Sequence, residues 1–487
     1  METVVLAIDQ GTTGTTVIAF NKKEEIIARG YAEFPQIYPK PGWVEHDPEV
    51  IWTTTEKVIA EVIARCGPVA AIGITNQRET TVIWDRASGR PIYNAIVWQC
   101  RRTADLCGQL AHAEPLFRQR TGLVLDAYFS GTKIRWLLDN VPGARARAEA
   151  GELCFGTIDS WLIWKLTGGK QHLTDFTNAS RTLLFDIGKQ GWDPELCDLL
   201  QVPTSLLPRV VPSSGVLAHT DSKSVFCRAI PIAGIAGDQQ AALYGQRCTQ
   251  PGQVKNTYGT GCFLMQFTGD NQRQSKHGLL TTLACHEDGS PGYALEGSVF
   301  IGGAAVQWLR DQLGLINHAE ETEAIATSLD GNGGVYLVPA FAGLGAPYWD
   351  MDARGTLTGL TRGTGRAHIV RAALESIAYQ SRDVLEAMNN DTGLDIPELR
   401  VDGGASNNAF LMQFQADQLS IPILCGSHAE MTAFGAALLA GRALDFWQGS
   451  ADTMTTGKRY EPQGGHERDA LYAGWKKAVQ ATCSDKP

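Results

Sequence analysis

The sequence predicts an α/β protein built from two domains. Its 487 residues are more than one hydrophobic core usually accommodates, so two or three domains are expected. Short β-rich runs alternate with runs of helical periodicity, which is typical of α/β architectures. Residues 4–18 and 254–267 also resemble each other, because each contains a strand, a turn rich in Gly and Thr, and a second β-prone run. A repeat this short is compatible with a duplicated domain or with chance.

The expected elements can be followed along the chain. A helix should begin at Pro48, because Asp47 can accept backbone N–H bonds at its start and proline suits the first helical position. Residues 368–388 have the apolar spacing of a long amphipathic helix. The polar stretch 247–253 is the expected boundary, giving domains of residues 1–247 and 248–487. Buried strands are expected at residues 4–8, 69–74, 230–235, 335–338 and 399–401.

Composition narrows the class of protein. A net charge of −10 argues against nucleic acid or an anionic membrane as the main partner, although glycine-rich turns and helix ends can still hold phosphate. The eleven cysteines are scattered and the ten histidines lack metal-ligand spacing, so neither a disulfide framework nor a zinc site is expected. The sequence begins without a signal-peptide pattern and has no apolar run of membrane-spanning length. We therefore expect a cytoplasmic protein without membrane insertion.

Three glycine-rich turns follow predicted strands, at residues 9–14 (DQGTTG), 259–261 (GTG) and 402–405 (DGGA). Glycine lets the backbone approach a ligand, free N–H groups suit phosphate oxygens, and an Asp at a strand end can hold a hydrated Mg²⁺. None of the turns is a P-loop or a G-x-G-x-x-G motif, and each alone is compatible with an ordinary turn. Their occurrence together favours a nucleotide whose phosphates lie between two domains.

Longer blocks carry a resemblance to a known family. They are AIDQGTT (7–13), QIYPKPGWVEHDP (36–48), GITNQRETT (73–81), NAIVWQCRR (94–102), YFSGTKIRW (128–136), IAGDQQAAL (235–243), KNTYGTGCF (255–263), VPAFAGLGAPYWD (338–350) and VDGG (401–404). On these blocks the chain resembles the FGGY sugar and polyol kinase family over nearly its whole length. The resemblance implies the actin-like ATPase fold, in which two ribonuclease-H-like domains flank an ATP-binding cleft, and it implies ATP-dependent phosphorylation of a small polyol, with glycerol as the expected substrate.

The resemblance assigns residues to the metal and the nucleotide. It implies that Asp9 holds Mg²⁺, whereas the residue alone would be interpreted as a turn-capping aspartate. Without the resemblance, Gln307 and Asn408 would be interpreted as solvated helix residues, and Gly303 as the start of a helix that ends near Leu313. The ATP contacts that the resemblance implies are Thr12, Thr13, Gly14, Thr260, Gly303, Gln307, Gly404 and Asn408.

The resemblance also assigns the polyol site. Arg78 and Glu79 are implied to hydrogen-bond adjacent hydroxyls, one as donor and one as acceptor, although an Arg-Glu dipeptide is more often a surface pair. Tyr128 is the implied third polar contact. Trp98 and Phe263 are implied to pack on the carbon face of the polyol, whereas each alone would be interpreted as a core residue.

Asp238 is the implied catalytic base, and Gln239 an implied substrate contact. In this role Asp238 accepts the proton of the attacking hydroxyl, and the product from glycerol is sn-glycerol 3-phosphate. Asp238 also follows a predicted strand and begins a predicted helix, so an N-cap is the alternative interpretation.

Two features depart from the family pattern. No Lys or Arg follows the first glycine-rich turn, where residues 14–17 are GTTV, and the sequence does not show which group replaces it. Residues 220–229 (TDSKSVFCRA) lack the glycine-rich loop with an Arg that binds a sugar bisphosphate in some members, so that form of allosteric inhibition is not expected.

The sequence leaves several alternatives open. The substrate could instead be a pentulose, a gluconate or a tetritol, and a non-catalytic, nucleotide-gated scaffold is the alternative of a different class. A homodimer and a homotetramer are both compatible with the sequence.

Overall fold

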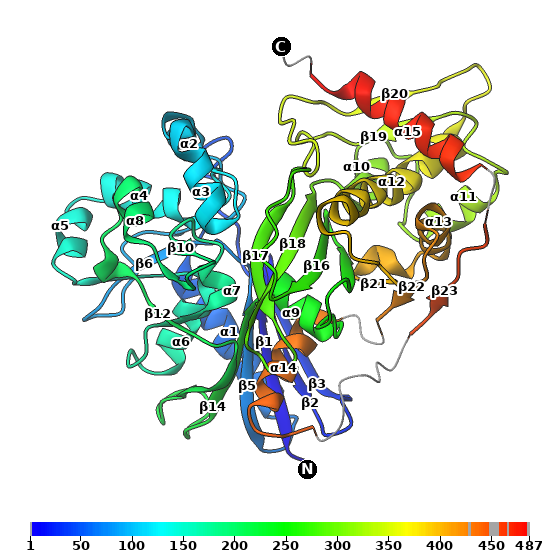
Figure 1. The fold of residues 1–487 in the computed structure, drawn as a ribbon. Helices are drawn as coiled ribbons and strands as arrows, with labels where there is room; N and C mark the ends of the chain where they lie inside the picture. Colours follow the sequence, from blue (N-terminus) through cyan, green and yellow to red (C-terminus); the bar gives the residue numbers. More distant parts are fainter. Residues whose placement is uncertain (1, 427–429, 448–456, 465–466, 485–487) are drawn as a thin grey trace.

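The computed structural model contains two β-sheets with helices between and around them (Figure 1). The structure describes residues 2–426, 430–447, 457–464 and 467–484. The first sheet, in spatial order, consists of β13 (Ser214–His219), β14 (Pro231–Gly237), β5 (Val69–Asn76), β1 (Val4–Gln10), β2 (Gly14–Phe20) and β3 (Ile26–Glu33). The second consists of β17 (Leu280–Cys285), β18 (Pro291–Val299), β16 (Cys262–Gly269), β15 (Val254–Tyr258), β21 (Leu399–Asp402), β22 (Ile423–Cys425) and β23 (Arg459–Tyr460).

The two sheets share one topology. In the first, β1 pairs antiparallel with β2 and β2 antiparallel with β3, while β1 is parallel to β5 and β5 is parallel to β14. In the second, β15, β16 and β18 form the antiparallel part and β15, β21 and β22 the parallel part. The repeat at residues 4–18 and 254–267 corresponds to the hairpins β1–β2 and β15–β16, which occupy equivalent places. The prediction of two ribonuclease-H-like units is therefore confirmed.

Most of the predicted elements are present. Helix α1 (Pro48–Ile63) begins at the predicted proline, and the Asp47 carboxylate accepts the Glu49 N–H at 2.8 Å. The predicted strands correspond to β1, β5, β14, β19 (Tyr336–Val338) and β21. Helix α12 (Arg366–Thr392) is longer and more enclosed than its amphipathic pattern predicted. It packs against β16, β18 and β19, and also against α10 (Gly303–Asp311), α11 (Glu321–Thr327), α13 (Ala409–Leu419) and α15 (Arg468–Thr482).

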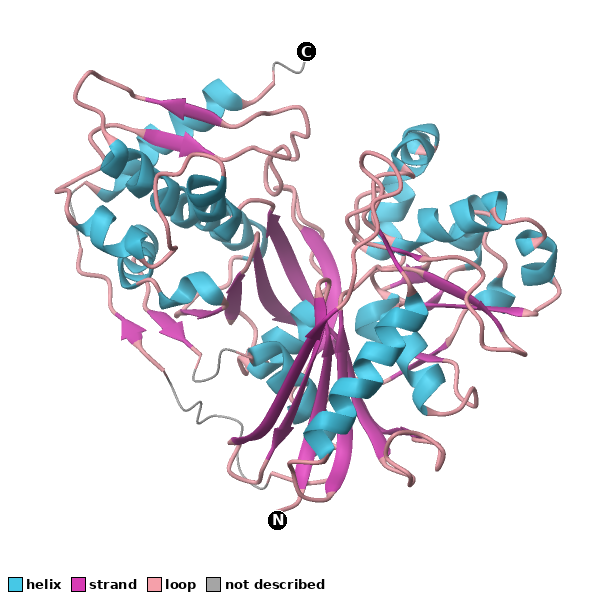
Figure 2. Ribbon diagram, turned by 180° about the vertical axis from the view of Figure 1, so that it is seen from behind, coloured by secondary structure: helices cyan, strands magenta, loops and turns pink. Residues whose placement is uncertain are grey.

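Two helices lie between the sheets. Helix α9 (Asp238–Gly245) follows β14 and contacts β15, β16 and β17 of the second sheet. Helix α14 (Met431–Arg442), coloured orange in Figure 1, returns from late in the chain to pack on α9 and on β1, β5 and β14 (Figures 1 and 2). The approach is close, because a Cβ at Gly435 would lie 1.8 Å from the Ala241 carbonyl oxygen. The boundary at residue 247 lies between α9 and β15 and stays a prediction, since α14 crosses back over it.

A large insertion between β5 and β14 has its own hydrophobic core, formed by residues such as Ile83, Phe117 and Phe129. It supplies several residues of the site described below. Its elements are β6 (Val82–Asp85), β7 (Ala95–Ile96), α2 (Ala104–Gln109), α3 (Glu114–Thr121), α4 (Ser130–Asn140), α5 (Ala144–Glu149), β8 (Leu153–Gly156), α6 (Ile158–Leu166), β9 (Leu173–Asp175), α7 (Phe176–Ala179), β10 (Phe185–Asp186), β11 (Gly191–Trp192), α8 (Pro194–Leu199) and β12 (Arg209–Val211). Strands β4 (Glu45–His46) and β20 (Thr356–Thr358) pair with β7 and β19.

Two further predictions from composition can be compared with the structure. The cysteines in the described part of the chain are all free. Among the described helices, none has the length and apolar character needed to cross a membrane.

Candidate active site

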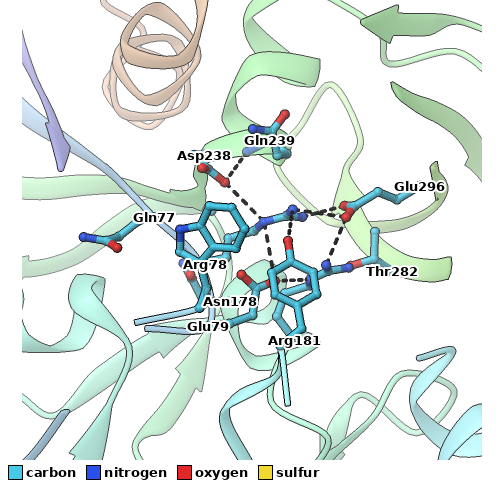
Figure 3. A network of polar contacts seen from close by, with 12 residues as sticks. Gln77, Arg78, Glu79, Asn178, Arg181, Asp238, Gln239, Thr282 and Glu296 are labelled. Carbon is cyan, nitrogen blue, oxygen red and sulfur yellow. Dashed lines mark hydrogen bonds and ion pairs between the residues drawn. The ribbon is translucent and has the colours of Figure 1, made fainter. Parts of the chain in front are cut away.

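The predicted polyol residues come together where the first sheet meets α9. Arg78 and Glu79 directly follow β5, and Asp238 is the first residue of α9, which follows β14. Because β5 and β14 are parallel neighbours, their carboxyl ends lie at the same edge of the sheet. The Arg78 Nε lies 3.2 Å from Asp238 Oδ1, and Arg78 Nη2 lies 3.5 Å from the Tyr128 hydroxyl (Figure 3). The half-buried Trp98 packs its ring edge on Tyr128, with the centroids 5.6 Å apart.

The Arg78–Glu79 pair is buried, so the surface-pair interpretation is wrong. Their exposed fractions are 2% and 1%. Glu79 adopts a left-handed backbone conformation with φ of 61°, which is strained for a residue with a side chain and costs on the order of 1–3 kcal/mol. The Ser130 hydroxyl donates to the Glu79 carbonyl at 3.0 Å, and Arg181 Nε donates to the Glu79 Oε1 at 2.6 Å. The surrounding structure therefore holds Glu79 in one orientation.

Two charged residues that the sequence analysis missed complete this cluster. Glu296 of β18 is fully buried and accepts hydrogen bonds from both Arg78 and Arg181 (Figure 3). Burial alone would raise the pKa of Glu296, but the two guanidinium groups hold it at about 2. The signal in the sequence is weak: each is a single charged residue in an otherwise uncharged segment, YALEGSV for Glu296 and NASRTLLF for Arg181.

Asp238 is the most open carboxylate of the cluster, with a side chain that is 31% exposed. Gly237 occupies the N-cap position of α9 and Asp238 the first helical position. The alternative interpretation of Asp238 as the N-cap is therefore wrong. Burial raises the pKa of Asp238, while Arg78 and the backbone N–H of Gln239 oppose that shift. A carboxylate in this setting can orient a hydroxyl and accept its proton.

Gln239 and Phe263 lie on the side of the second sheet. The Gln239 Oε1 accepts from Lys255 Nζ at 2.5 Å, and Lys255 also donates to the Thr257 hydroxyl at 2.9 Å. Burial lowers the pKa of Lys255 to about 8, although Asp402 and Asp238 favour its charged form. Phe263 is half-buried on β16, opposite Thr257. Lys255 and Arg78 are thus buried cations close to Asp238. Residues 14–17, directly after the first glycine-rich turn, include no Lys or Arg.

Asp9 lies in β1, the strand beside β5. Burial raises its pKa to about 8, and the nearby carboxylates of Asp238 and Glu430 add to that shift. A divalent cation would relieve the repulsion between these carboxylates, so the donor set suits Mg²⁺. In the described ranges no group of three metal-ligating side chains is found. Water and phosphate oxygens would therefore have to complete the coordination, as is usual for Mg²⁺.

The first glycine-rich turn connects β1 to β2. The turn closes through a hydrogen bond from Gly11 N–H to the Gly14 carbonyl at 2.9 Å, and Gly14 itself is buried at the start of β2. The Thr12 hydroxyl accepts from the Trp98 indole N–H at 2.9 Å, which joins this turn to the polyol cluster. The neighbouring Thr13 is exposed.

The second turn connects β15 to β16 and carries the exposed Thr260. Helix α10 begins at Gly303, as predicted, and it is tied to this turn because the Gly303 N–H donates to the Gly259 carbonyl at 2.9 Å. One turn further along α10, Gln307 is exposed. Thr260 therefore lies on this turn, and Gly303 and Gln307 lie on the helix that is hydrogen-bonded to it.

The third turn follows β21. Gly404 is exposed, and a Cβ added there would meet no heavy atom within 4 Å, which leaves space for a ligand. The Asn408 side chain is already engaged, because its Oδ1 accepts from the Leu411 N–H at 2.9 Å and its Nδ2 donates to the Thr322 hydroxyl at 3.1 Å. Asn408 therefore caps α13 in this structure.

Residues 220–229, where the sequence departs from the family's regulatory loop, follow β13. The Thr220 hydroxyl donates to the Arg228 carbonyl at 2.8 Å, and the Arg228 side chain reaches the Val69 carbonyl at 3.4 Å. The absence of sugar bisphosphate inhibition stays a prediction.

Two protein-family profiles match the chain, one in each half. Residues 4–245 match the profile of the FGGY family of carbohydrate kinases, N-terminal domain, and residues 254–444 match that of its C-terminal domain. The chain is 58% identical over 486 residues to a protein named glycerol kinase from Symbiobacterium thermophilum, covering 98% of this chain and 97% of that protein.

Two solved structures share the fold. The crystal structure of Plasmodium falciparum glycerol kinase with ADP matches with a TM-score of 0.93 at 36% identity, covering 100% of this chain and 99% of the other. The crystal structure of gluconate kinase from Lactobacillus acidophilus matches with a TM-score of 0.88 at 21% identity, covering 99% and 98% of the two chains.

Proposed function

Because this chain belongs to the FGGY family of carbohydrate kinases, we propose that it transfers the γ-phosphoryl group of ATP to glycerol, giving sn-glycerol 3-phosphate. The high identity to relatives named glycerol kinase over nearly the full length supports this substrate. The observation that carries the proposal is the buried Arg78–Glu79 pair, which lies beside the more open Asp238.

The polar cluster suits a small polyol. Glu79 Oε1 is engaged by Arg181, and among the described residues no hydrogen bond reaches Oε2. Oε2 can therefore accept a hydrogen bond from one hydroxyl, while Arg78 donates to the neighbouring hydroxyl. Tyr128 supplies the third polar contact, and Trp98 and Phe263 pack on the carbon face of the polyol.

Asp238 acts as the base in this proposal, with Gln239 contacting the substrate beside it. It orients the attacking hydroxyl and accepts its proton as the phosphoryl group is transferred. Because the transition state of phosphoryl transfer is loose, positioning of the hydroxyl matters more than the strength of the base.

The nucleotide is proposed to lie along the three turns. Asp9 would hold Mg²⁺, which would supply positive charge to neutralise the phosphates. The side chains and backbone of this chain then orient the nucleotide: Thr12, Thr13, Gly14, Thr260, Gly303, Gln307, Gly404 and Asn408. Asn408 contacts adenosine in this proposal, either while its side chain still accepts the Leu411 N–H at the start of α13 or after giving up that hydrogen bond.

The proposal includes three further expectations. The boundary between the two domains lies at residue 247, and the protein is located in the cytoplasm. Assembly into a homodimer or a homotetramer is tested by sedimentation velocity.

A substrate panel tests the proposed function. ADP release is measured with glycerol, erythritol, xylulose and gluconate at matched concentrations, with Mg²⁺ and ATP present. We expect the highest kcat/KM with glycerol. A higher value with xylulose, gluconate or erythritol would instead identify another carbohydrate kinase of this family, and ATP binding without turnover on any of them would favour the nucleotide-gated scaffold.

A further inference from the structure

The polyol cluster is held together by a closed ring of buried charges. Glu79, Arg181, Glu296 and Arg78 alternate in sign around it, and each is at most 2% exposed. The ring closes where Arg78 Nε lies 3.7 Å from Glu79 Oε1. Three of the four come from the first half of the chain, whereas Glu296 comes from β18 of the second sheet. The ring therefore spans the two halves of the molecule (Figure 3).

Glu296 fixes the guanidinium group of Arg78. Arg78 Nη1 lies 2.6 Å from Glu296 Oε2, and Arg78 Nη2 lies 3.1 Å from Oε1, so the contact is bidentate. This geometry holds the plane of the guanidinium group as well as its position. It also leaves Arg78 Nε directed at Asp238, 3.2 Å away.

Arg181 fixes the carboxylate of Glu79. Its Nε donates to Glu79 Oε1 at 2.6 Å, and its Nη2 donates to Glu296 Oε1 at 3.0 Å. One guanidinium group thus spans two carboxylates from different halves of the chain. Because Oε1 of Glu79 is engaged, the orientation of its second oxygen is set by Arg181.

The strand next to the one that carries Glu296 is hydrogen-bonded to α9, the helix that Asp238 begins. The Gln240 Nε2 of α9 donates to the Thr282 hydroxyl at 3.2 Å and to the Leu283 carbonyl of β17 at 3.1 Å. Strand β17 pairs with β18 along its length, with Leu280 opposite Glu296. The position of Glu296 relative to Asp238 is therefore fixed by backbone and side-chain hydrogen bonds.

We propose that Glu296 and Arg181 are positioning residues that set the selectivity of the site for two adjacent hydroxyl groups, an inference that rests on the proposed function. Neither needs to touch the substrate: Glu296 holds Arg78 as the donor, and Arg181 holds Glu79 as the acceptor. A contribution to protein stability is a poor explanation for the ring, because replacing a buried ion pair with apolar residues of similar volume often leaves the stability of a protein unchanged.

The test is the variant Glu296→Gln, which keeps the shape of the side chain and removes its charge. We expect the KM for glycerol to rise at least tenfold, with kcat changing less than threefold and the KM for ATP less than twofold. The preference for glycerol over propane-1,3-diol, which lacks the middle hydroxyl, should fall at least fivefold in kcat/KM.

A matched control separates positioning from stability. Glu375 of α12 is also buried and accepts from Arg371 Nε at 2.7 Å, but it belongs to no part of the site. Glu375→Gln should lower the melting temperature and leave the KM for glycerol and the selectivity unchanged. If Glu296→Gln behaves as this control does, the inference is wrong.

A second variant decides the question if Glu296→Gln does not fold. Arg181→Lys keeps the charge but cannot span Glu79 and Glu296, so the KM for glycerol should rise at least fivefold. An unchanged KM and an unchanged selectivity would overturn the inference. If the wild-type protein does not turn over glycerol, the proposed function is wrong and this inference with it. If the wild-type protein turns over glycerol and the variant keeps its KM and selectivity, the inference alone is wrong.

Discussion

The polyol side and the nucleotide side of the candidate site are built in different ways. On the polyol side, charged side chains are buried and bonded to one another, with Arg78 contacting Glu296, Asp238 and Tyr128. On the nucleotide side, Thr13, Thr260, Gln307 and Gly404 are exposed on turns and on the surface of α10. The polyol side is therefore held by contacts within the protein, whereas the nucleotide side offers turns and exposed side chains.

This difference follows from what each ligand demands. A small neutral polyol has only hydroxyl groups by which it can be distinguished, so donors and acceptors must be held in fixed directions. A nucleotide has charged phosphates, which backbone N–H groups, hydroxyls and a metal ion can bind from several directions. Substitutions on the polyol side should accordingly have larger effects than substitutions on the nucleotide side.

The largest effect is expected at Asp238. Asp238→Asn keeps the size of the side chain but cannot accept the proton of the attacking hydroxyl, so kcat should fall by about 10²–10⁴-fold. Glycerol binding, measured by calorimetric titration, should change much less because Arg78, Glu79 and Tyr128 remain. Near-normal turnover in an ADP-release assay would show that Asp238 is not the base.

The next largest effect is expected at Arg78. Arg78→Lys keeps the charge but loses the bidentate contact with Glu296, and we expect kcat/KM for glycerol to fall roughly 100-fold. Partial loss of the partner of a buried carboxylate should also lower the free energy of unfolding by about 3 kcal/mol, measured by urea denaturation. The matched variant Arg371→Lys, in the buried pair with Glu375, should lose stability and keep its KM for glycerol. Equal kinetic effects of the two variants would show that the loss of activity comes from destabilisation and not from the polyol contacts of Arg78.

A smaller, pH-dependent effect is expected at Asp9. Its pKa is raised to about 8 without metal, so below that pH its carboxyl is protonated and a proton competes with Mg²⁺. Mg²⁺-nucleotide affinity should therefore fall up to about tenfold for each pH unit below 8, and it should level off above 8. Titration of the nucleotide between pH 6 and 9 measures this, and Asp9→Asn should remove the dependence. An affinity that rises as the pH falls would rule out this role for Asp9.

The sequence was sufficient for the fold, and it indicated many of the residues that the structure brings together in the candidate site. The hairpins β1–β2 and β15–β16 were predictable because strands, glycines and turn residues act locally. The burial of Arg78 and Glu79 was not, because an Arg-Glu dipeptide carries no local signal for the partners that neutralise it. Those partners, Arg181 and Glu296, lie 102 and 218 residues away along the chain from Glu79 and Arg78, respectively.

The same reasoning explains other differences. The return of α14 to the first sheet depends on its packing against α9, which no local pattern encodes. The helical capping role of Asn408 could have been predicted, since Asn at the start of a helix commonly accepts a backbone N–H. For Lys255 the sequence block was recognised, but its burial beside Gln239 required the second sheet to be placed.

The smallest effects are expected at the threonines of the first two glycine-rich turns. Within the described chain, the hydroxyls of Thr13 and Thr260 make no hydrogen bond, so Thr13→Ala and Thr260→Ala should leave the melting temperature and the KM for glycerol unchanged. Each should lose about 1 kcal/mol of phosphate binding, a rise of about fivefold in the KM for ATP.

Thr12→Ala is the informative contrast, because Thr12 accepts from Trp98 at 2.9 Å and Trp98 packs on Tyr128. It should raise the KM for both substrates. If Thr12→Ala raises the KM for ATP alone, the polyol side and the nucleotide side are independent, and the Thr12–Trp98 hydrogen bond does not couple them.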